Sequence, residues 1–322
     1  MIKKVRIRNY KCYGEQPADF ELAHINFIYG DNSVGKSTFL QCLSRIYHMY
    51  DGGNMSIPAN KELDNRSFMG KGADNIDIQM QTGDDMLWYG KVADGRFALR
   101  NDAGEIVKKN DYFLAVPWLR HAEAPGPKRN KESDAFEKLK GSLIDSESIE
   151  AINRMFERLG VGYKCTDVMT LEDSVLGLPG IPVADVGTGI AVMFDMLQSI
   201  AAWQKGILLL EEPEANVNER QLKSLTGLLV DEAKKRFDVD GQLVVECHSE
   251  LMMLEIRNLL VHGVITPDDI AVFVVTKDQH GSAVAKIPLD KFGNILHPWP
   301  GGFFPSRVQI SDDYFADEGE HR

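Results

Sequence analysis

The chain has 322 residues, and 36 Lys and Arg against 48 Asp and Glu give it a formal net charge of −12 and a pI near 5.2. Its 43% hydrophobic and 26% charged residues are typical of a globular protein and exclude a disordered or collagen-like chain. No run of about eighteen apolar residues occurs, and residues 1–8 alternate charged with β-branched side chains. We therefore expect a cytoplasmic protein with neither a membrane span nor a secretion signal.

The cysteines and the charge pattern narrow the class of partner. The four cysteines form no CxxC pair and no zinc-type cluster with histidine, so we expect reduced thiols. The acidic total disfavours a protein that wraps nucleic acid, because phosphate binding relies on clustered Lys and Arg. Two basic stretches, residues 3–11 and 128–140, leave local DNA contact open, although solvated strand and helix faces are the simpler interpretation of both.

In chain order, the first expected elements are a strand over Ile25–Tyr29 and a helix over Ser37–Tyr50. The strand is apolar at almost every position, which is typical of a parallel sheet that helices cover on both faces. The helix repeats its apolar residues at helical spacing. This order of strand, loop and helix indicates an α/β fold from the beginning of the chain.

The middle of the chain has a different pattern, with shorter strands and more charge. Its expected elements are a hairpin-like stretch over Ile76–Val107 with a turn at Asp94-Gly95, a charged helical stretch over 134–141, and a helix over Glu147–Leu159 closed by Gly160. No heptad run is long enough for an extended coiled coil.

The α/β pattern then returns and continues almost to the end. The expected elements are helices over Ile190–Ile200, Leu222–Ala233 and Leu251–Leu260, the last between an N-cap at Ser249 and a stop at Gly263, and strands over Ile207–Leu210, Leu243–Glu246 and Ile270–Val275. We therefore predict a discontinuous α/β core with a mostly parallel central sheet over residues 1–50 and 183–310. An inserted α+β lobe would occupy 51–182, and an acidic tail 311–322.

A phosphate-binding loop is the strongest motif. Residues Gly30–Ser37 match GxxxxGK[ST] between the first strand and the first helix, which is the context that this motif requires. The glycines let the backbone wrap a phosphate, and the helix N-terminus offers free N–H groups and a positive dipole end. Lys36 would reach the β and γ phosphates, and the Ser37 hydroxyl would hold Mg²⁺. The predicted nucleotide-binding residues are Asn32, Ser33, Val34, Gly35, Lys36, Ser37 and Thr38.

Two carboxylates end the buried strand that begins at Ile207. Ligands bind at the carboxyl edge of parallel strands, so both carboxylates would lie near the phosphates. Adjacent strand residues point to opposite sides, and Glu211 and Glu212 should therefore have different roles. We assign Glu211 to Mg²⁺ and Glu212 to the polarisation of the attacking water. A pair of surface acids after a strand is the plain alternative.

Two further segments extend this site. His248 follows the strand over Leu243–Glu246 at the same edge, where it can donate a hydrogen bond to a γ phosphate, whereas Cys247 beside it is assigned to packing. Gly187, Thr188 and Gly189 open a helix, and such a helix N-terminus can cap the γ phosphate of a nucleotide held by another subunit.

The order GDNSVGKST, DVGTG, ILLLEEPEANVNERQ and VVECHSE resembles the ABC-type ATPase heads of the SMC, RecF and overcoming-lysogenization-defect (OLD) proteins. The stretch Ile7–Lys11 is similar to the one that precedes the phosphate loop in these heads. The E-E-P-E and D-V-G-x-G strings resemble small bacterial OLD-type ATPases in particular. The segments Ile270–Ile287 and Trp299–Phe304 are similar to the end of a group of such ATPases without an assigned function.

This resemblance implies a head-to-tail homodimer, or a larger homo-oligomer, that encloses ATP and Mg²⁺. The residues that enclose each nucleotide would be Lys36, Ser37, Glu211, Glu212 and His248 of one subunit and Gly187–Gly189 of the other. Asn216 and Asn218 would cross the interface where relatives often carry histidines, and this departure leaves the communication role of that segment open. The usual signature serine is absent, and either Thr188 or the backbone N–H groups alone would take its place.

The resemblance also implies functions. Many OLD proteins carry a Toprim-type nuclease domain, but too few residues follow His248 for it and no D-x-D pair is present, so we expect no nuclease activity. The first hypothesis is a slow or triggered ATPase that regulates a separately encoded nuclease or toxin in bacterial anti-phage defence. The alternative is a RecF- or SMC-like DNA-binding ATPase in DNA repair or maintenance. A transporter subunit fits less well because the L-S-G-G-Q string is absent, and a scaffold without hydrolysis fits less well because Glu212 and His248 are present.

Overall fold

A six-stranded sheet with the order β14-β13-β3-β12-β11-β7 forms the centre of the molecule. The computed structural model describes residues 1–50, 75–83, 85–91, 97–105, 118–119, 145–167, 169–297 and 299–300. The strands are β3 (Ile25–Tyr29), β7 (Trp118–Leu119), β11 (Ile207–Glu211), β12 (Gln242–Glu246), β13 (Ile270–Asp278) and β14 (Gly281–Ile287). All neighbours pair in parallel except β13 and β14, which confirms the mostly parallel central sheet.

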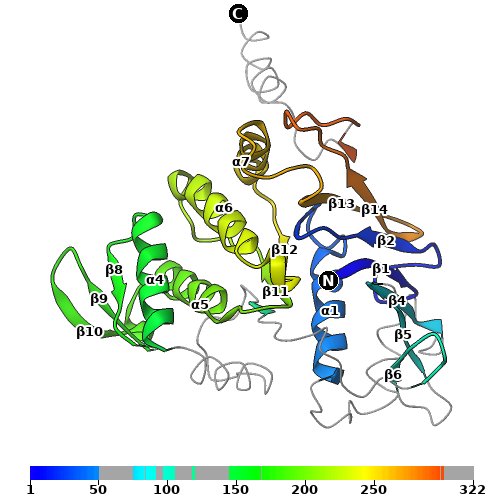
Figure 1. Cartoon of the computed structure of the whole chain (residues 1–322), viewed down its shortest axis with the longest axis horizontal. Coiled ribbons are helices and arrows are strands. Elements are labelled where there is room, and N and C mark those ends of the chain that lie inside the picture. The colour runs from blue at the N-terminus through cyan, green and yellow to red at the C-terminus, as the bar shows by residue number, and fades with distance from the viewer. Residues whose placement is uncertain are drawn as a thin grey trace, which may run out of the picture.

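One face of this sheet is covered by a helix and a second, antiparallel sheet. The helix is α1 (Lys36–Tyr50), and the five strands, in the order β2-β1-β4-β5-β6, are β1 (Ile2–Arg8), β2 (Ala18–Glu21), β4 (Asp77–Thr82), β5 (Asp85–Lys91) and β6 (Phe97–Arg100). Figure 1 shows this sheet, coloured blue to cyan, beside α1. The three layers meet at Phe20 of β2, whose ring stacks on Phe39 of α1 at 3.8 Å between centroids and meets Phe273 of β13 edge-on at 5.3 Å. This aromatic core holds α1 against the central sheet, close to β3, the strand that precedes α1 in the chain.

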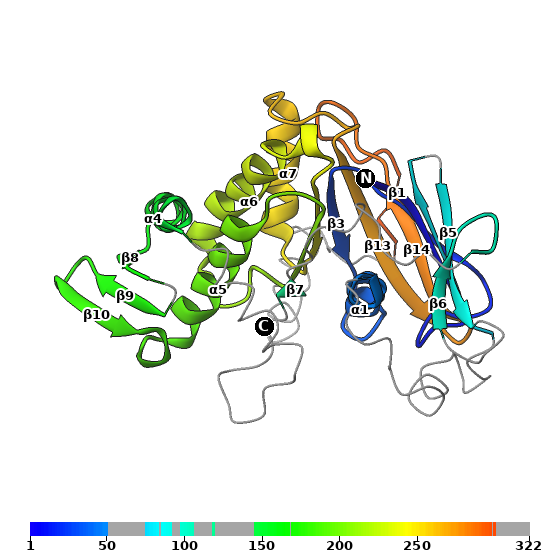
Figure 2. The same cartoon turned by 60° about the horizontal axis from the view of Figure 1, so that its bottom comes forward.

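The opposite face is covered by helices. They are α4 (Ser146–Arg158), α5 (Thr188–Ala202), α6 (Glu219–Lys234) and α7 (Glu250–Val261), with the short 3-10 turns Val183–Asp185 and Phe237–Val239. A small antiparallel sheet of β8 (Tyr163–Cys165), β9 (Thr170–Asp173) and β10 (Leu178–Pro182) lies beyond α4. Figure 2 shows α5, α6 and α7 on one side of the central sheet and α1 on the other.

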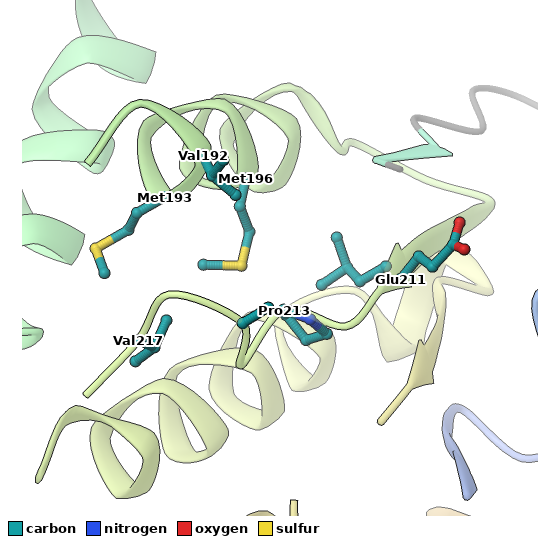
Figure 3. Close-up of a pocket in the computed structure, with 8 residues that line it drawn as sticks. Val192, Met193, Met196, Glu211, Pro213 and Val217 are labelled. Carbon is teal, nitrogen blue, oxygen red and sulfur yellow. The ribbon is translucent and has the colours of Figure 1, made fainter. Parts of the chain in front are cut away.

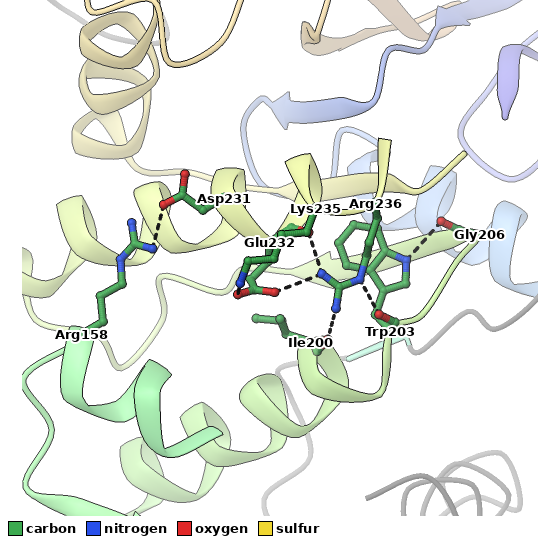
Figure 4. A network of polar contacts seen from close by, with 8 residues as sticks. All are labelled: Arg158, Ile200, Trp203, Gly206, Asp231, Glu232, Lys235 and Arg236. Carbon is green, nitrogen blue, oxygen red and sulfur yellow. Dashed lines mark hydrogen bonds and ion pairs between the residues drawn. The ribbon is translucent and has the colours of Figure 1, made fainter. Parts of the chain in front are cut away.

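Arg236, just after α6, ties the helices of this face together (Figure 4). Its guanidinium donates to the carbonyl oxygens of Trp203 and Ile200 at the end of α5, and it pairs with the Glu232 carboxylate at 3.0 Å. The same group lies over the Trp203 ring at 4.6 Å. Arg158 of α4 adds a 2.8 Å ion pair to α6, so the helical layer has polar bonds as well as an apolar core.

The segment 51–182 is predicted as one inserted lobe. In its described part, β4 to β6 and α4 lie on opposite faces of the central sheet, and β7 belongs to that sheet through its pairing with β11. Strand β4 pairs with β1, with Ile78 opposite Ile7, and so completes a sheet that begins near the N-terminus. Helix α4 packs on the other face, where Phe156 stacks on Phe194 of α5 at 6.0 Å. The hairpin expected over Ile76–Val107 corresponds to three strands, since β4, β5 and β6 pair in sequence. Its Asp94-Gly95 turn, the helical stretch 134–141, the basic stretch 128–140 and the tail 311–322 lie outside the described residues.

The predicted helix ends agree with the structure. Ser249 is the N-cap of α7 and its hydroxyl accepts a hydrogen bond from Met252 N, which satisfies one free donor of the first turn. Gly160 and Gly263 follow α4 and α7 with a φ of +65°, a conformation in which glycine has no steric penalty. Within the described ranges, no helix is both long and apolar enough to cross a bilayer. The four cysteines are free thiols.

Candidate nucleotide site

The loop Gly30–Ser37 follows β3 and turns directly into α1. Gly30 has a φ of +147°, and a Cβ placed there would lie 2.3 Å from the Val275 carbonyl oxygen. Gly35 has a φ of +122°, and its Cβ would lie 2.7 Å from Cys12 Sγ. Both positions therefore require glycine for the backbone conformation and for space.

Side chains from distant parts of the sequence hold this loop in place. The Tyr13 hydroxyl donates a 2.9 Å hydrogen bond to the Gly35 carbonyl, and the Ser282 hydroxyl donates to the Val34 carbonyl. Cys12 contacts Thr38 through its thiol at 3.6 Å. The segment after β1 and the start of β14 thus surround the loop, whereas the sequence indicated only the neighbouring stretch Ile7–Lys11. Asn32 and Ser33 are exposed, and Ser33 has a left-handed φ of +64°.

Lys36 lies inside the loop with 3% of its side chain exposed. Its ammonium donates to the carbonyl oxygens of Gly30 at 3.1 Å and Asp31 at 2.8 Å. Burial lowers the pKa of Lys36, and the Glu246 carboxylate, 3.7 Å away, acts in the opposite direction. The lysine is therefore a buried cation at the centre of the loop, where a phosphate group is the ligand of complementary charge.

Glu246 is the site residue that sequence reasoning did not identify. It ends β12 with only 2% of its surface exposed, and its Oε1 accepts a 2.9 Å hydrogen bond from the Ser37 hydroxyl. Burial and the charge of Glu211 raise the pKa of Glu246 to about 7. The sequence does contain a signal for Glu246. A carboxylate directly after the apolar run Leu243–Val245 is expected to be buried, and its burial is destabilising unless it has a partner.

The structure places Glu211 and Glu212 in different surroundings. Glu211 is in register with Glu246 on the neighbouring strand, and it follows Ile207 and Leu209, whose side chains lie in the core on the α1 side. Glu212 leaves the strand with a φ of +48°, held by a 2.9 Å bond from its N–H to the Glu246 carbonyl. A left-handed glutamate costs about 1–2 kcal/mol, and such strain is concentrated at functional sites.

Glu212 and His248 form a pair at the same edge of the sheet. Glu212 Oε1 lies 3.1 Å from His248 Nε2, and the backbone N–H of His248 donates to Glu214 Oε1 at 2.5 Å. Burial and the charge of Lys36 lower the pKa of His248, and the neighbouring Glu212 carboxylate acts in the opposite direction. Glu212, Glu246 and His248 each offer a ligand atom, and these atoms lie within 4.8 Å of one another. The predicted bond from His248 to a γ phosphate requires an exchange of its contact with Glu212.

The segment after β11 packs under α5. Figure 3 shows Pro213 and Val217 facing the side chains of Met193 and Met196, which line a small apolar cavity with them. This contact links the acidic strand to the helix that begins at the predicted DVGTG turn.

The turn itself lies on the helical face of the molecule. Gly187 is the N-cap of α5, Thr188 is its first residue, and a Cβ on Gly189 would lie 3.2 Å from the Asn216 carbonyl. A hollow of about 390 Å³ runs between this turn, residues 160–163 and the Asn216–Asn218 segment. Across the described ranges, none of the hydrogen bonds or ion pairs of Gly187–Gly189 reaches the phosphate loop of the same chain. The structure thus brings together all predicted residues except this turn.

Comparisons with known proteins agree with this geometry. A family model described as an AAA domain matches residues 4–110, which include the phosphate loop, and a second model, described as a protein of unknown function (DUF3696), matches residues 265–305. A search of curated proteins found no significant match.

Solved structures of SMC heads superpose on most of the chain. The SMC head domain from Thermotoga maritima aligns with a TM-score of 0.56 at 14% identity and covers 89% of this chain and 98% of its own. The chain therefore has a mixed α/β P-loop fold that resembles the SMC head domain. An Smc head bound to the C-winged helix domain of ScpA aligns with a TM-score of 0.57 at 13% identity, covering 90% and 98%. An Smc head with an extended coiled coil, bound to the C-terminal domain of ScpA derived from Pyrococcus furiosus, aligns at 0.54 and 12%, covering 89% and 96%. The mixed α/β P-loop fold predicted from the sequence is confirmed, and the finer likeness to OLD proteins stays a prediction.

Proposed function

We propose that this chain binds and hydrolyses ATP and that two copies close head to tail around it. One observation carries the proposal: Lys36, Ser37, Glu212 and His248, from three separate segments, converge at the carboxyl edge of one parallel sheet. Ligands of open α/β sheets bind at this edge. An AAA domain match over the phosphate loop supports the same assignment.

The residues present fit ATP with Mg²⁺. The loop glycines leave no room for side chains, the buried Lys36 supplies a positive charge, and Ser37 with the nearby carboxylates supplies oxygen donors of the kind that Mg²⁺ prefers. Bound Mg²⁺ neutralises charge on the phosphate oxygens. Lys36 would exchange its bonds to the Gly30 and Asp31 carbonyls for bonds to phosphate.

Glu212 is the proposed group that positions and polarises the attacking water. Its carboxylate lies at the sheet edge, partly exposed and beside the imidazole of His248. A proton on His248 Nε2 can be shared between Glu212 and an oxygen of the γ phosphate. Glu212 would then position the attacking water only when the γ phosphate is bound. The strained backbone of Glu212 supports a role that packing alone does not require.

The second half of each site is proposed to come from a partner copy. The Gly187–Gly189 turn presents a helix N-terminus, and Gly187 has open space around it. Such a terminus stabilises a negative group through its free N–H donors. Asn216 lies directly beside Gly189, so the two segments expected at the interface already form one surface.

For the cellular role, the comparisons support the SMC- and RecF-like alternative more than the anti-phage hypothesis. The heads that superpose on the chain are SMC heads, two of them bound to a domain of ScpA. We therefore propose a DNA-maintenance ATPase that binds a partner protein when it closes. The regulation of a nuclease or toxin effector is the competing proposal. In the basic stretch 3–11, which is a candidate for DNA contact, Lys4 and Arg6 both form ion pairs with Asp19, so part of its positive charge is already neutralised.

One experiment separates these roles. The Glu212→Gln protein would be held with Mg-ATP, and its mass, its bound proteins and its affinity for duplex DNA at two salt concentrations would be measured. DNA affinity that falls steeply with salt supports the maintenance role, because released counterions drive phosphate contacts. A stoichiometric nuclease or toxin without DNA would overturn it in favour of the effector role.

A further inference from the structure

Glu246 holds a position that the nucleotide proposal leaves without a task. Its Oε1 contacts both Ser37 Oγ at 2.9 Å and Lys36 Nζ at 3.7 Å. Its Oε2 is buried and has no hydrogen-bond partner among the described residues, and only 2% of the Glu246 surface is exposed. A buried carboxylate oxygen without a partner is destabilising, so its presence points to a ligand at this position.

The strand order places Glu246 nearer to the phosphate loop than Glu211. Strand β12 lies between β3, which leads into the loop, and β11, which ends at Glu211. Glu246 pairs with Ile28 on one side and with Glu211 on the other. A cation beside Ser37 therefore meets Glu246 first, and Glu211 lies one strand farther away.

Charge balance shows which partner is missing. Phosphate oxygens that approach Lys36 would come close to the Glu246 carboxylate, and two anions in a buried site repel each other strongly. A divalent cation between them removes this repulsion and satisfies Oε2. Ser37 already holds its hydroxyl oxygen beside the carboxylate, so one ion can replace the hydrogen bond that joins them.

We propose that Glu246 is a direct carboxylate ligand of the Mg²⁺ ion, together with Ser37, and that Glu211 acts on the ion from one strand farther away. This inference rests on the proposed nucleotide site and adds a ligand to it. The two oxygen donors favour a hard cation such as Mg²⁺ or Mn²⁺ over a softer transition metal. His248 stays outside this ligand set, because its Nε2 is directed to Glu212.

The first test uses Mn²⁺ as the probe. Free Mn²⁺ would be titrated by electron paramagnetic resonance against wild type, Glu246→Gln and Glu250→Gln, without nucleotide and with saturating ADP. Glutamine keeps the shape of the side chain and can still bond to Ser37, while Glu250, in the first turn of α7, is the matched acidic control. We expect a loss of Mn²⁺ affinity of at least about tenfold for Glu246→Gln only, because mutation of even the outer partners of metal ligands costs about 10–100-fold.

The second test changes the metal preference. Glu246→Cys replaces a hard oxygen with a soft thiolate, which should disfavour Mg²⁺ and favour Cd²⁺. A Cd²⁺-thiolate charge-transfer band that is absent from wild type, with the four native cysteines unchanged, would identify direct contact with the ion. This readout does not depend on turnover.

The outcomes distinguish this inference from the proposed function. Wild-type protein that binds neither nucleotide nor Mn²⁺ overturns both. A folded Glu246→Gln protein that binds nucleotide and Mn²⁺ as wild type does, or a Glu246→Cys protein without the Cd²⁺ band, overturns the role of Glu246 alone and leaves the ATPase proposal standing.

Discussion

The phosphate-loop edge and the Gly187–Gly189 turn carry two halves of one proposed site, and they differ in how complete they are. At the loop, Lys36 and Glu246 are buried, and bonds from Tyr13 and Ser282 fix the backbone. At the turn, no atom of the described residues, apart from the two chain neighbours, lies within 4 Å of a Cβ placed on Gly187, and the side chains around it are largely exposed. The first half is assembled by folding, whereas the second needs a surface from outside the chain.

The largest effect is expected at the loop edge from Glu212→Gln. Removal of a group that positions water slows a reaction about 10²–10⁴-fold, while the neutral side chain leaves the ATP contacts of Lys36 and Ser37 in place. Phosphate release and nucleotide affinity would be measured side by side. Unchanged turnover would transfer the role to Glu211 or Glu214.

Lys36→Ala tests the same half through binding. Loss of the buried ammonium removes the charged donor of the loop, and we expect nucleotide affinity to fall by about 100-fold. A fluorescent nucleotide titration measures this, with the exposed Lys223→Ala as control. Wild-type affinity in the Lys36 variant would contradict the assignment of the loop.

Gly187→Glu tests the open half. The backbone at Gly187, with φ −58° and ψ 144°, accepts any residue, and the space beside it is free, so the fold should tolerate the change. A carboxylate there would repel the γ phosphate of a partner. We expect the Glu212→Gln background to lose its ATP-dependent dimer by sedimentation while nucleotide binding stays within about twofold, and Gly187→Ala to keep the dimer. If the dimer still forms in the Gly187→Glu variant, the Gly187–Gly189 turn is not the second half of the nucleotide site.

Arg236→Lys tests the helical layer that holds α5, the helix that begins at the Gly187–Gly189 turn. Lysine cannot reproduce the planar fork that bonds to Trp203, Ile200 and Glu232 and stacks on the indole. We expect a loss of about 2 kcal/mol in urea unfolding, with little change in nucleotide affinity. Lys235→Arg is the control, because Lys235 pairs with the same Glu232 but is itself exposed. An equal loss of stability in both variants would show that the planar guanidinium of Arg236 is unimportant.

Asp19→Asn should have the smallest effect, on the layer beside α1. A hydrogen bond from Arg6 lowers the pKa of Asp19 to about 2 from its ordinary 3.8. Its stabilisation is therefore present above about pH 4 and lost as the pH falls toward 2. Because the pair is partly exposed, we expect on the order of 1 kcal/mol at pH 7. Unfolding curves of both proteins should converge near pH 2, and a difference that persists there would exclude the ion pair as its cause.

The sequence predicted the elements whose pattern is local. Strand β3 has the predicted bounds, and α1 and α7 begin one residue before their predicted starts, because apolar runs, the loop motif and the Ser249 cap are written in neighbouring residues. The pairing of β4 with β1 was not predictable in this way, since it joins residues about seventy positions apart and depends on register.

The site shows the same division. Lys36 and Ser37 are predicted from the spacing of the loop motif, and Glu212 from its place at the end of a buried strand. Glu246 was missed because its meaning comes from three contacts across the fold: the Ser37 hydroxyl, the Lys36 ammonium and the N–H of Glu212. A single acid at the end of a strand has many ordinary explanations until its neighbours in space are known.

The bonds that hold the phosphate loop also affect the entropy that is lost when a nucleotide binds. Tyr13 and Ser282 fix the carbonyls of Gly35 and Val34 through bonds that do not involve the residues proposed to contact phosphate. A preorganised loop loses little backbone entropy on binding, which otherwise amounts to about 1–2 kcal/mol for each ordered residue. A loop held in this way would act as a rigid receptor, and in the proposed dimer the arrival of the second head, not a disorder-to-order transition of the loop, would be the step open to control.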